Sequence, residues 1–496
     1  LKLREELKKK IKINWKSKSD TETILEMFEN FGIEESIKKF KGMFAIAIWD
    51  KKKKLLTLIR DRFGEKPLFF GWVSNSLVFS SELKAIVNSI SFNKILNLKA
   101  ISSFMRLSYI PSPLTIYENI YKLGPGEKLE INKKGLSECY LQNFKEYSNY
   151  SNAKFTKWWK PNKFINNLGN YSKDIENQIH LKIEESVKGQ MISDVKNGVF
   201  LSGGIDSSLI TALYQKNSLE KIKSFTIGSS NYLMDESKYA KEVANHLGTD
   251  HHEIIVNPED QINLIEKLPE IYDEPFADSS QIPSLLINKF ASDHVKVSLT
   301  GDGGDEIFCG YNRYVYSYQI WELLKTLKKY KIQSLGKILN KIPKNVILKL
   351  EAIINFLYKG DGGVTLLQEK IKKISDGLTN SKNLNELYLT HVNSWQNNQN
   401  IILNEDLNFL PETFNFDSKN EHDYILDMQQ TDLQTYLPDD ILCKSDRASM
   451  FSSLENRSPF LDQDIFDLAC SMPHKMKINK KRGKYVLKEI LSNYVP

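Results

Sequence analysis

The sequence contains few cysteines and lacks several motifs that identify metal sites. Its four cysteines, Cys139, Cys309, Cys443 and Cys470, lie far apart, and none forms a C-x-x-C pair or a Cys/His zinc spacing. The eight histidines include no H-E-x-x-H motif. We therefore expect neither a zinc centre nor a disulfide framework, and the cysteine usage favours a reducing, cytoplasmic setting.

Long apolar runs and basic stripes are also missing. No stretch of about 18 apolar, uncharged residues is present, so we expect no membrane-spanning helix. The net charge of +6 is spread over 496 residues, and no basic stripe is interleaved with aromatic residues, which argues against nucleic-acid binding. Ordinary apolar (41%) and charged (26%) contents at this length indicate a soluble protein of two to four domains.

The most informative stretch is residues 199–208, which read V-F-L-S-G-G-I-D-S-S. The pattern predicts a strand, a tight glycine turn and a helix N-terminus, whose unpaired N–H groups and serine hydroxyls suit a phosphate. Asp206 suits a Mg²⁺ ion that accompanies a phosphate. The stretch is neither a Walker A loop nor a dinucleotide fingerprint. A capped strand-turn-helix without a ligand is the alternative interpretation.

From about residue 173 the pattern alternates between helix and strand, which predicts a doubly wound parallel α/β sheet. In such sheets ligands bind at the carboxyl ends of the strands. The expected elements are helices over 173–192 and 235–247, a helix opened by residues 206–208 with helical periodicity over 209–214, and strands over 199–201, 222–227, 252–256 and 295–299.

An acidic, glycine-rich segment, T-G-D-G-G-D-E at residues 300–306, follows the last of these strands. At a carboxyl end of the sheet, its three carboxylates (Asp302, Asp305 and Glu306) would collect Mg²⁺ beside the 199–208 loop. A flexible acidic turn is the alternative interpretation, since the spacing does not match a calcium-binding EF-hand loop.

Residues 436–462 form a third constellation. Taken alone, this stretch predicts a buried helical hairpin with a few ion pairs. Lys444 and Arg447 lie about one helical turn apart, so one helix face could present both cations to the negative charge that develops on a leaving pyrophosphate.

The first part of the chain is β-rich with helices at its edges. We expect a helix over residues 1–10, a helix that begins with a capping box at S-D-T-E (19–22), and a hairpin over 42–60. Residues 88–135 are turn-rich and predict a connector, and residues 141–165 have no clear period and predict an irregular insertion.

The ordered segments S-D-T-E, G-M-F-A-I-A-I-W-D, R-D-R-F-G-E-K-P-L and S-S-E-L-K-A resemble the glutaminase domain of glutamine-hydrolysing asparagine synthetases. The S-G-G-x-D-S loop resembles the pyrophosphate loop of ATP pyrophosphatases. D-D-x-L-x-K-x-D-R-x-S-M and the following L-E-x-R-x-P-F-L-D resemble the synthetase domain of the same family. The resemblance implies a partial Ntn-type α+β glutaminase with antiparallel sheets (1–90), a connector and insertion (91–172), and an α/β doubly wound synthetase domain with a C-terminal helical portion (173–496).

The resemblance also implies roles for individual residues. Asp20 would contact glutamine, residues 272–280 would form a wall of the acyl-acceptor pocket, and Asp206 and Asp305 would share Mg²⁺. The catalytic residues would be Asp302, Lys444 and Arg447, without a choice between the two cations. The residues expected at ATP and pyrophosphate are Leu201, Ser202, Gly203, Gly204, Asp206, Ser207, Ile227, Thr300 and Gly301.

The implied reaction converts ATP, aspartate, glutamine and water into AMP, pyrophosphate, asparagine and glutamate through β-aspartyl-AMP. The cofactors would be ATP and Mg²⁺, and the partners would be aspartate and glutamine or ammonia, with a homodimer left open. The family's nucleophile is an N-terminal cysteine, whereas this sequence begins at Leu1 and its first cysteine is Cys139. Both ends look truncated, and we expect this form not to hydrolyse glutamine.

Two alternatives remain open from the sequence. The same machinery could act on another carboxylate, as in an amidotransferase for a sugar or peptide or in a lactam-forming synthetase. The chain could also be a catalytically incomplete fragment that binds nucleotide without turnover.

Overall fold

The computed structural model describes residues 2–89, 92–135, 152–164, 169–229, 235–315, 332–357, 367–381, 384–395, 410–414, 421–479 and 482–496. Cys139 and residues 141–151 of the predicted insertion lie outside this part of the chain. The chain divides into a first unit (Leu1–Lys94, Asn119–Asn162 and Leu461–Asp464) and a second unit (Ile95–Glu118, Lys163–Phe460 and Ile465–Pro496). Among the described helices, none has the length and apolar character needed to cross a membrane.

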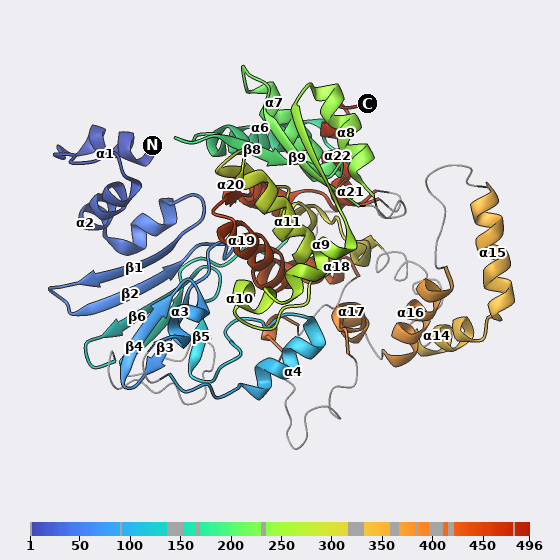
Figure 1. The fold of residues 1–496 in the computed structure, drawn as a ribbon, viewed down its shortest axis with the longest axis horizontal. Helices are drawn as coiled ribbons and strands as arrows, with labels where there is room; N and C mark the ends of the chain where they lie inside the picture. Colours follow the sequence, from blue (N-terminus) through green and yellow to red (C-terminus); the bar gives the residue numbers. More distant parts are fainter. Residues whose placement is uncertain are drawn as a thin grey trace. The chain divides into compact units, whose positions relative to one another are not determined.

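The first unit contains two antiparallel sheets, with strand orders β1-β2-β6-β7 and β4-β3-β5 (Figure 1). The predicted hairpin is confirmed, since Asp50 pairs with Leu55 across the lysine-rich turn. The elements of this unit are α1 (Lys2–Lys10), α2 (Asp20–Lys39), β1 (Ala45–Asp50), β2 (Leu55–Arg60), β3 (Phe69–Val73), β4 (Ser76–Ser80), α3 (Leu83–Val87), β5 (Ile120–Lys122), β6 (Glu127–Asn132) and β7 (Ala153–Lys157).

Strand β2 separates two hydrophobic cores. Leu56 and Leu58 pack with Phe70 of β3 and Leu129 of β6, so the two sheets share one core. Ile59 points to the opposite face and packs with residues of α1 and α2. This alternation along one strand produces a helical layer and two sheet layers. The expectation of antiparallel sheets in this part of the chain is confirmed.

Two stretches within the first 165 residues contain more regular structure than their sequence pattern predicts. The 88–135 stretch contains α4 (Leu98–Leu107), β5 and β6, and the predicted irregular insertion contains β7, which pairs with β6. The alternation of buried Ala153 and Phe155 was readable in the sequence, but the strand is short. The capping box is half formed. Ser19 accepts from the Thr21 amide, whereas Glu22 accepts from the amides of residues 16 and 17.

The second unit contains one parallel sheet with strand order β10-β9-β8-β11-β12. Its strands are β8 (Asn197–Phe200), β9 (Lys223–Ser229), β10 (Asp250–Val256), β11 (Val297–Leu299) and β12 (Glu455–Arg457). Its helices are α4, α6 (Lys173–Gln190), α7 (Ile205–Lys216), α8 (Ser237–Leu247), α9 (Pro258–Ile265), α10 (Leu268–Tyr272), α11 (Gln281–Ser292), α12 (Gly304–Phe308), α14 (Ile332–Asn340), α15 (Lys344–Leu357), α16 (Leu367–Asn380), α17 (Leu384–Val392), η2 (Glu412–Phe414), α18 (Glu421–Gln434), η3 (Leu437–Ile441), α19 (Leu442–Phe451), α20 (Gln463–Ser471), α21 (His474–Lys477) and α22 (Tyr485–Leu491).

The strand order places the reversal of the sheet between β8 and β11. From β8 the chain adds β9 and β10 on one side, and it later adds β11 and β12 on the other side. Helix α7 packs with α6, α8 and α22, whereas α11 packs with α19 (Figure 1). The segments after β8 and β11 therefore emerge side by side at the carboxyl edge, where α/β sheets bind ligands. The predicted parallel sheet is confirmed.

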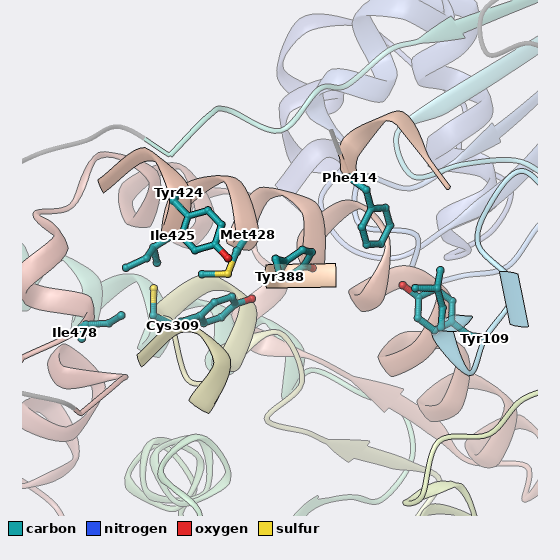
Figure 2. Packing of buried hydrophobic residues seen from close by; sticks show 10 residues of the cluster. Tyr109, Cys309, Tyr388, Phe414, Tyr424, Ile425, Met428 and Ile478 are labelled. Atoms are coloured by element: carbon teal, nitrogen blue, oxygen red, sulfur yellow. The ribbon is translucent and has the colours of Figure 1, made fainter. Parts of the chain in front are cut away.

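A buried aromatic cluster lies between α18 and the segment that follows α12 (Figure 2). Tyr314 and Tyr388 donate hydrogen bonds to Asp432, which is 1% exposed, and Arg313 forms an ion pair with the same carboxylate. The buried charge is thus paired and hydrogen-bonded. The cluster anchors the segment that leads away from the acidic loop.

In the first unit, Asp61 organises the R-D-R-F-G-E-K-P-L segment. Its buried carboxylate accepts hydrogen bonds from the amides of Glu65 and Lys66, both at 2.9 Å, and from the Phe44 amide at 3.3 Å. A buried anion satisfied by several amides is costly to alter, because the donors lose their acceptor.

We predict that Asp61→Asn lowers the free energy of unfolding by about 2–3 kcal/mol, because an amide has one acceptor oxygen for these donors. Urea unfolding followed by tryptophan fluorescence measures the change. Asp50→Asn is the control. Asp50 accepts two amides at an exposed hairpin turn, so its substitution should lower the free energy of unfolding much less. Equal effects of the two substitutions would contradict the assignment.

Candidate functional site

The turn after β8 has the geometry expected of a phosphate loop. Leu201 donates its amide to Phe225 of β9, so the turn begins at the sheet edge. Gly203 has a φ of +78°, and a Cβ there would lie 2.7 Å from the Ala240 amide nitrogen. Ser202 and Ser207 are within hydrogen-bonding distance through their hydroxyls (3.0 Å). Glycine is thus required for the turn, and α7 begins directly after it.

The acidic segment after β11 packs directly on this turn. A Cβ on Gly301 would lie 2.9 Å from the Asp206 Cβ, and a Cβ on Gly304 would lie 2.7 Å from the Asp206 Cγ. Thr300 donates its amide to Arg457 of β12 and its hydroxyl to Asp302. The two glycines therefore permit the close approach that the sequence pattern predicted for these loops.

Lys484 joins the two loops. Its Nζ donates to Asp206 and lies 2.7 Å from Asp305 Oδ1. Gly310 leaves room for this pair, because a Cβ there would lie 1.9 Å from Asp305 Oδ1 and 2.0 Å from Lys484 Cε. Lys484 itself has a φ of +55°, a rare conformation for a non-glycine residue. Three distant segments thus meet around one ammonium group.

The electrostatics of this pair reflect burial and mutual charge. Burial, Asp305 and Asp302 raise the pKa of Asp206 to about 6, against the lowering effect of Lys484. Burial lowers the pKa of the Lys484 ammonium, but the attraction of Asp206 and Asp305 exceeds this effect and the net pKa is raised. The Lys484 ammonium thus offsets part of the cost of burying the two carboxylates.

The residues present fit a magnesium ion that shares its coordination with a phosphate. Asp206 and Asp305 supply carboxylate oxygens, and Asp206 Oδ1 is buried without a hydrogen-bond partner. Within the described ranges, no group of three or more His, Cys, Asp or Glu side chains is arranged to bind a metal alone. Two acids without further protein ligands suit Mg²⁺, which usually keeps waters and phosphate oxygens.

Glu306 does not belong to this acidic edge. The sequence analysis grouped its carboxylate with Asp302 and Asp305, but the side chain is 1% exposed and accepts a hydrogen bond from Tyr311 at 2.5 Å. Burial, together with Asp305, raises the pKa of Glu306 to about 8. The helical turn of α12 explains the difference, since adjacent residues on a helix point in different directions.

Lys444 and Arg447 lie on α19, as the predicted helix requires, and both face carboxylates of the 272–280 segment. Lys444 Nζ lies 3.1 Å from Asp278 Oδ2 and donates to Ser280 at 2.7 Å. Arg447 Nη1 lies 3.9 Å from Asp273 Oδ2. Their predicted role at the leaving pyrophosphate stays a prediction.

The helical-hairpin interpretation of residues 436–462 was partly wrong. A π-helical turn, η3, precedes α19, and residues 455–457 form strand β12 beside β11. Three polar residues carry no strand pattern, and only their pairing with buried Val297–Leu299 defines β12.

The remaining predicted residues divide between the units. Asp302 is half-buried next to Thr300, and Ile227 lies in the carboxyl-terminal half of β9. Asp20 is the first residue of α2 in the first unit, with an exposed side chain.

Lys484 is the site residue that the sequence analysis missed. It follows Gly483, whose Cβ position would lie 2.1 Å from the Cys309 carbonyl oxygen, and it precedes α22. A Gly-Lys pair before a periodic helix was the available signal. No motif spacing links this pair to Asp206 or Asp305.

The comparisons with known proteins cover both units. The family model described as Asparagine synthase matches residues 178–496, and the one described as Glutamine amidotransferase domain matches residues 1–145. Asparagine synthetase [glutamine-hydrolyzing] 1 of Bacillus subtilis is 30% identical over 499 residues, which cover 100% of this chain and 72% of the relative. A Methanocaldococcus jannaschii protein provisionally named asparagine synthetase 2 is 36% identical over 330 residues, covering 66% of this chain and 60% of that protein. Family models match both parts of the chain, and the Bacillus subtilis protein matches it over its whole length. The chain therefore belongs to the glutamine-hydrolysing asparagine synthetase family.

Proposed function

We propose that this chain catalyses the ATP-dependent amidation of aspartate to asparagine through β-aspartyl-AMP. The observation that carries the proposal is the convergence of the β8 turn, the acidic loop and Lys484 at the reversal point of the sheet. A carboxylate is a poor electrophile, so an adenylating site must bind the phosphates of ATP and stabilise pyrophosphate as it leaves. The relatives' names supply the acyl acceptor and the nitrogen donor.

In this proposal the glycine turn and the start of α7 bind the pyrophosphate through backbone N–H groups and serine hydroxyls. The residues assigned to ATP and pyrophosphate are Leu201, Ser202, Gly203, Gly204, Asp206, Ser207, Ile227, Thr300 and Gly301.

Asp206 and Asp305 would bind Mg²⁺, which when bound would neutralise charge on the phosphates. Lys484 supplies a fixed positive charge beside the same carboxylates. The β-carboxylate of aspartate attacks the α-phosphorus, the bond to pyrophosphate breaks, and ammonia then displaces AMP from the acyl carbon.

We assign Asp302, whose carboxylate accepts a hydrogen bond from the Thr300 hydroxyl, to the proton that the attacking ammonia loses. Lys444 and Arg447 are assigned to the acyl-adenylate side, since both contact the 272–280 segment. In the first unit, Asp20 is assigned to glutamine in an Ntn-type glutaminase fold.

We predict that Lys484→Met reduces aspartate-dependent exchange between ATP and pyrophosphate by about 100-fold or more, because the leaving group loses a buried counter-charge. Gly310→Ala should reduce it strongly as well, since a Cβ would displace the Lys484–Asp305 pair. Isotope exchange with L-aspartate measures both effects.

Two controls accompany this experiment. Lys475→Met removes an exposed lysine, and Gly189→Ala adds a Cβ where no atom lies within 4 Å, so both should retain exchange. Exchange between ATP and pyrophosphate that does not depend on aspartate would contradict aspartate as the acyl acceptor. Wild-type exchange by Lys484→Met would contradict the role of Lys484. Ammonium chloride replaces glutamine when asparagine formation is measured.

The raised pKa of Asp206 gives a second prediction. Because the folded value of about 6 lies above the usual value of about 3.9, Asp206 contributes stability that is complete below pH 4 and is lost as the pH rises through 6. Relative to wild type, Asp206→Asn should gain up to about 3 kcal/mol between pH 4 and pH 7 in metal-free buffer.

Urea unfolding across this pH range measures the difference. Asp250→Asn is the control. Its difference in stability from wild type should change with pH in the opposite direction, because the hydrogen bond from Lys223 lowers the pKa of the exposed Asp250 carboxyl. If the free energies of unfolding of wild type and Asp206→Asn differ by the same amount at every pH, the pKa of Asp206 is not raised in the folded protein.

A further inference from the structure

A pair of carboxyl groups, Asp278 and Asp440, lies beside Lys444 and away from the acids assigned to magnesium. Asp278 Oδ1 accepts from the Ser280 amide (2.6 Å) and hydroxyl (2.5 Å), and its Oδ2 accepts from Lys444 at 3.1 Å. Asp440 forms a side-chain hydrogen bond with Asp278. The two acids come from different segments, the one that precedes α11 and the π-helical turn η3.

Asp440 has an oxygen to which the structure gives no partner. The residue is 3% exposed, and its buried Oδ1 has no hydrogen-bond partner among the residues that the structure describes. Its neighbour Asp439 differs, because both of its oxygens accept from Ser112, at 2.7 and 2.8 Å. A buried carboxylate oxygen without a donor is costly, so this position favours a cationic or hydrogen-bonding ligand.

Among the described residues, the two cations near the pair form their ion pairs with Asp278 and Asp432, and neither forms an ion pair with Asp440. Lys444 contacts Asp278, and Arg313 forms its ion pair with Asp432. A hydrogen bond between two carboxyl groups requires a proton on one of them, and burial raises the pKa of Asp440, with Asp278 adding to the effect. The titratable and charged groups around Asp440 are Asp278, Lys444, Arg313, Tyr109, Tyr272 and Tyr436.

The surroundings favour an ammonium group over a metal ion. Lys444 already donates to Asp278 Oδ2, and its positive charge would repel a divalent cation at the pair about twice as strongly as it repels a monovalent ammonium group. Residues 275, 277 and 279 are exposed, so solvent reaches the segment that carries Asp278. The π-helical turn is also typical of functional sites, because it shifts side chains out of the regular helical register.

Building on the proposed amidation of an amino acid, we propose that the Asp278–Asp440 pair receives the α-ammonium group of the substrate. The ammonium replaces the shared proton, which leaves to solvent, and it donates to Asp440 Oδ1. Lys444, on the opposite side of Asp278, remains available to the carboxylates of the substrate. The pair then selects an α-amino dicarboxylic acid over a dicarboxylic acid without an amino group.

The test compares L-aspartate with succinate, which lacks the amino group, in calorimetric binding and in isotope exchange between ATP and pyrophosphate. Wild type should bind aspartate at least about 30-fold more tightly than succinate and should release protons as aspartate binds. Asp440→Asn should lose most of this preference and the proton release, while its weak response to succinate stays unchanged. Asp440→Leu removes the same buried carboxyl group without altering the Lys444–Asp278 ion pair, and it serves as the second variant if Asp440→Asn does not fold.

Asp439→Asn is the matched control, since it alters a neighbouring buried acid that Ser112 satisfies. It should retain the preference for aspartate even if it is less stable. If Asp440→Asn still prefers aspartate to succinate, or loses affinity for both ligands equally, the inference about the ammonium site is wrong, while the proposed function is unaffected. Wild type that binds aspartate but shows no aspartate-dependent exchange would overturn the proposed function, and wild type that binds no aspartate would overturn both.

Discussion

The ammonium group of Lys484 joins three parts of the second unit that are far apart in the chain. It contacts the acid at the start of α7 and the acid at the start of α12, and it approaches both from the residue that precedes α22. Without this charge, two buried or half-buried carboxylates would face each other, which is strongly unfavourable. The close packing of Gly301, Gly304 and Gly310 around the pair depends on the same attraction.

The parallel sheet explains why these loops can meet at all. Its order places β8 and β11 next to each other, so both of their carboxyl-terminal segments emerge at one edge. Behind this edge, Asp432 and its tyrosine and arginine partners fix the segment after α12 in a dry core. The acidic loop is thus fixed at both ends, by β11 and by the aromatic cluster, as a preorganised binding site requires.

Much of this arrangement could be predicted from the sequence, because the main signals were local. The S-G-G-x-D-S turn, the acidic glycine segment and the alternating helix and strand pattern each lie within a few residues. Strand β12 could not be predicted in this way, because its three polar residues become a strand only through pairing with β11. The direction of the Glu306 side chain and the position of Lys484 depend on tertiary packing, which single-sequence patterns do not contain.

The separation of Asp206, Asp305 and Lys484 along the chain has a consequence for protein synthesis. As the nascent chain leaves the ribosome, the β8 turn and the acidic loop are complete long before Lys484 appears. During that interval the two acids lack their counter-charge, so the edge of the sheet stays open or recruits a cation from solution. The counter-charge of these two carboxylates is therefore complete only after Lys484 has been synthesised.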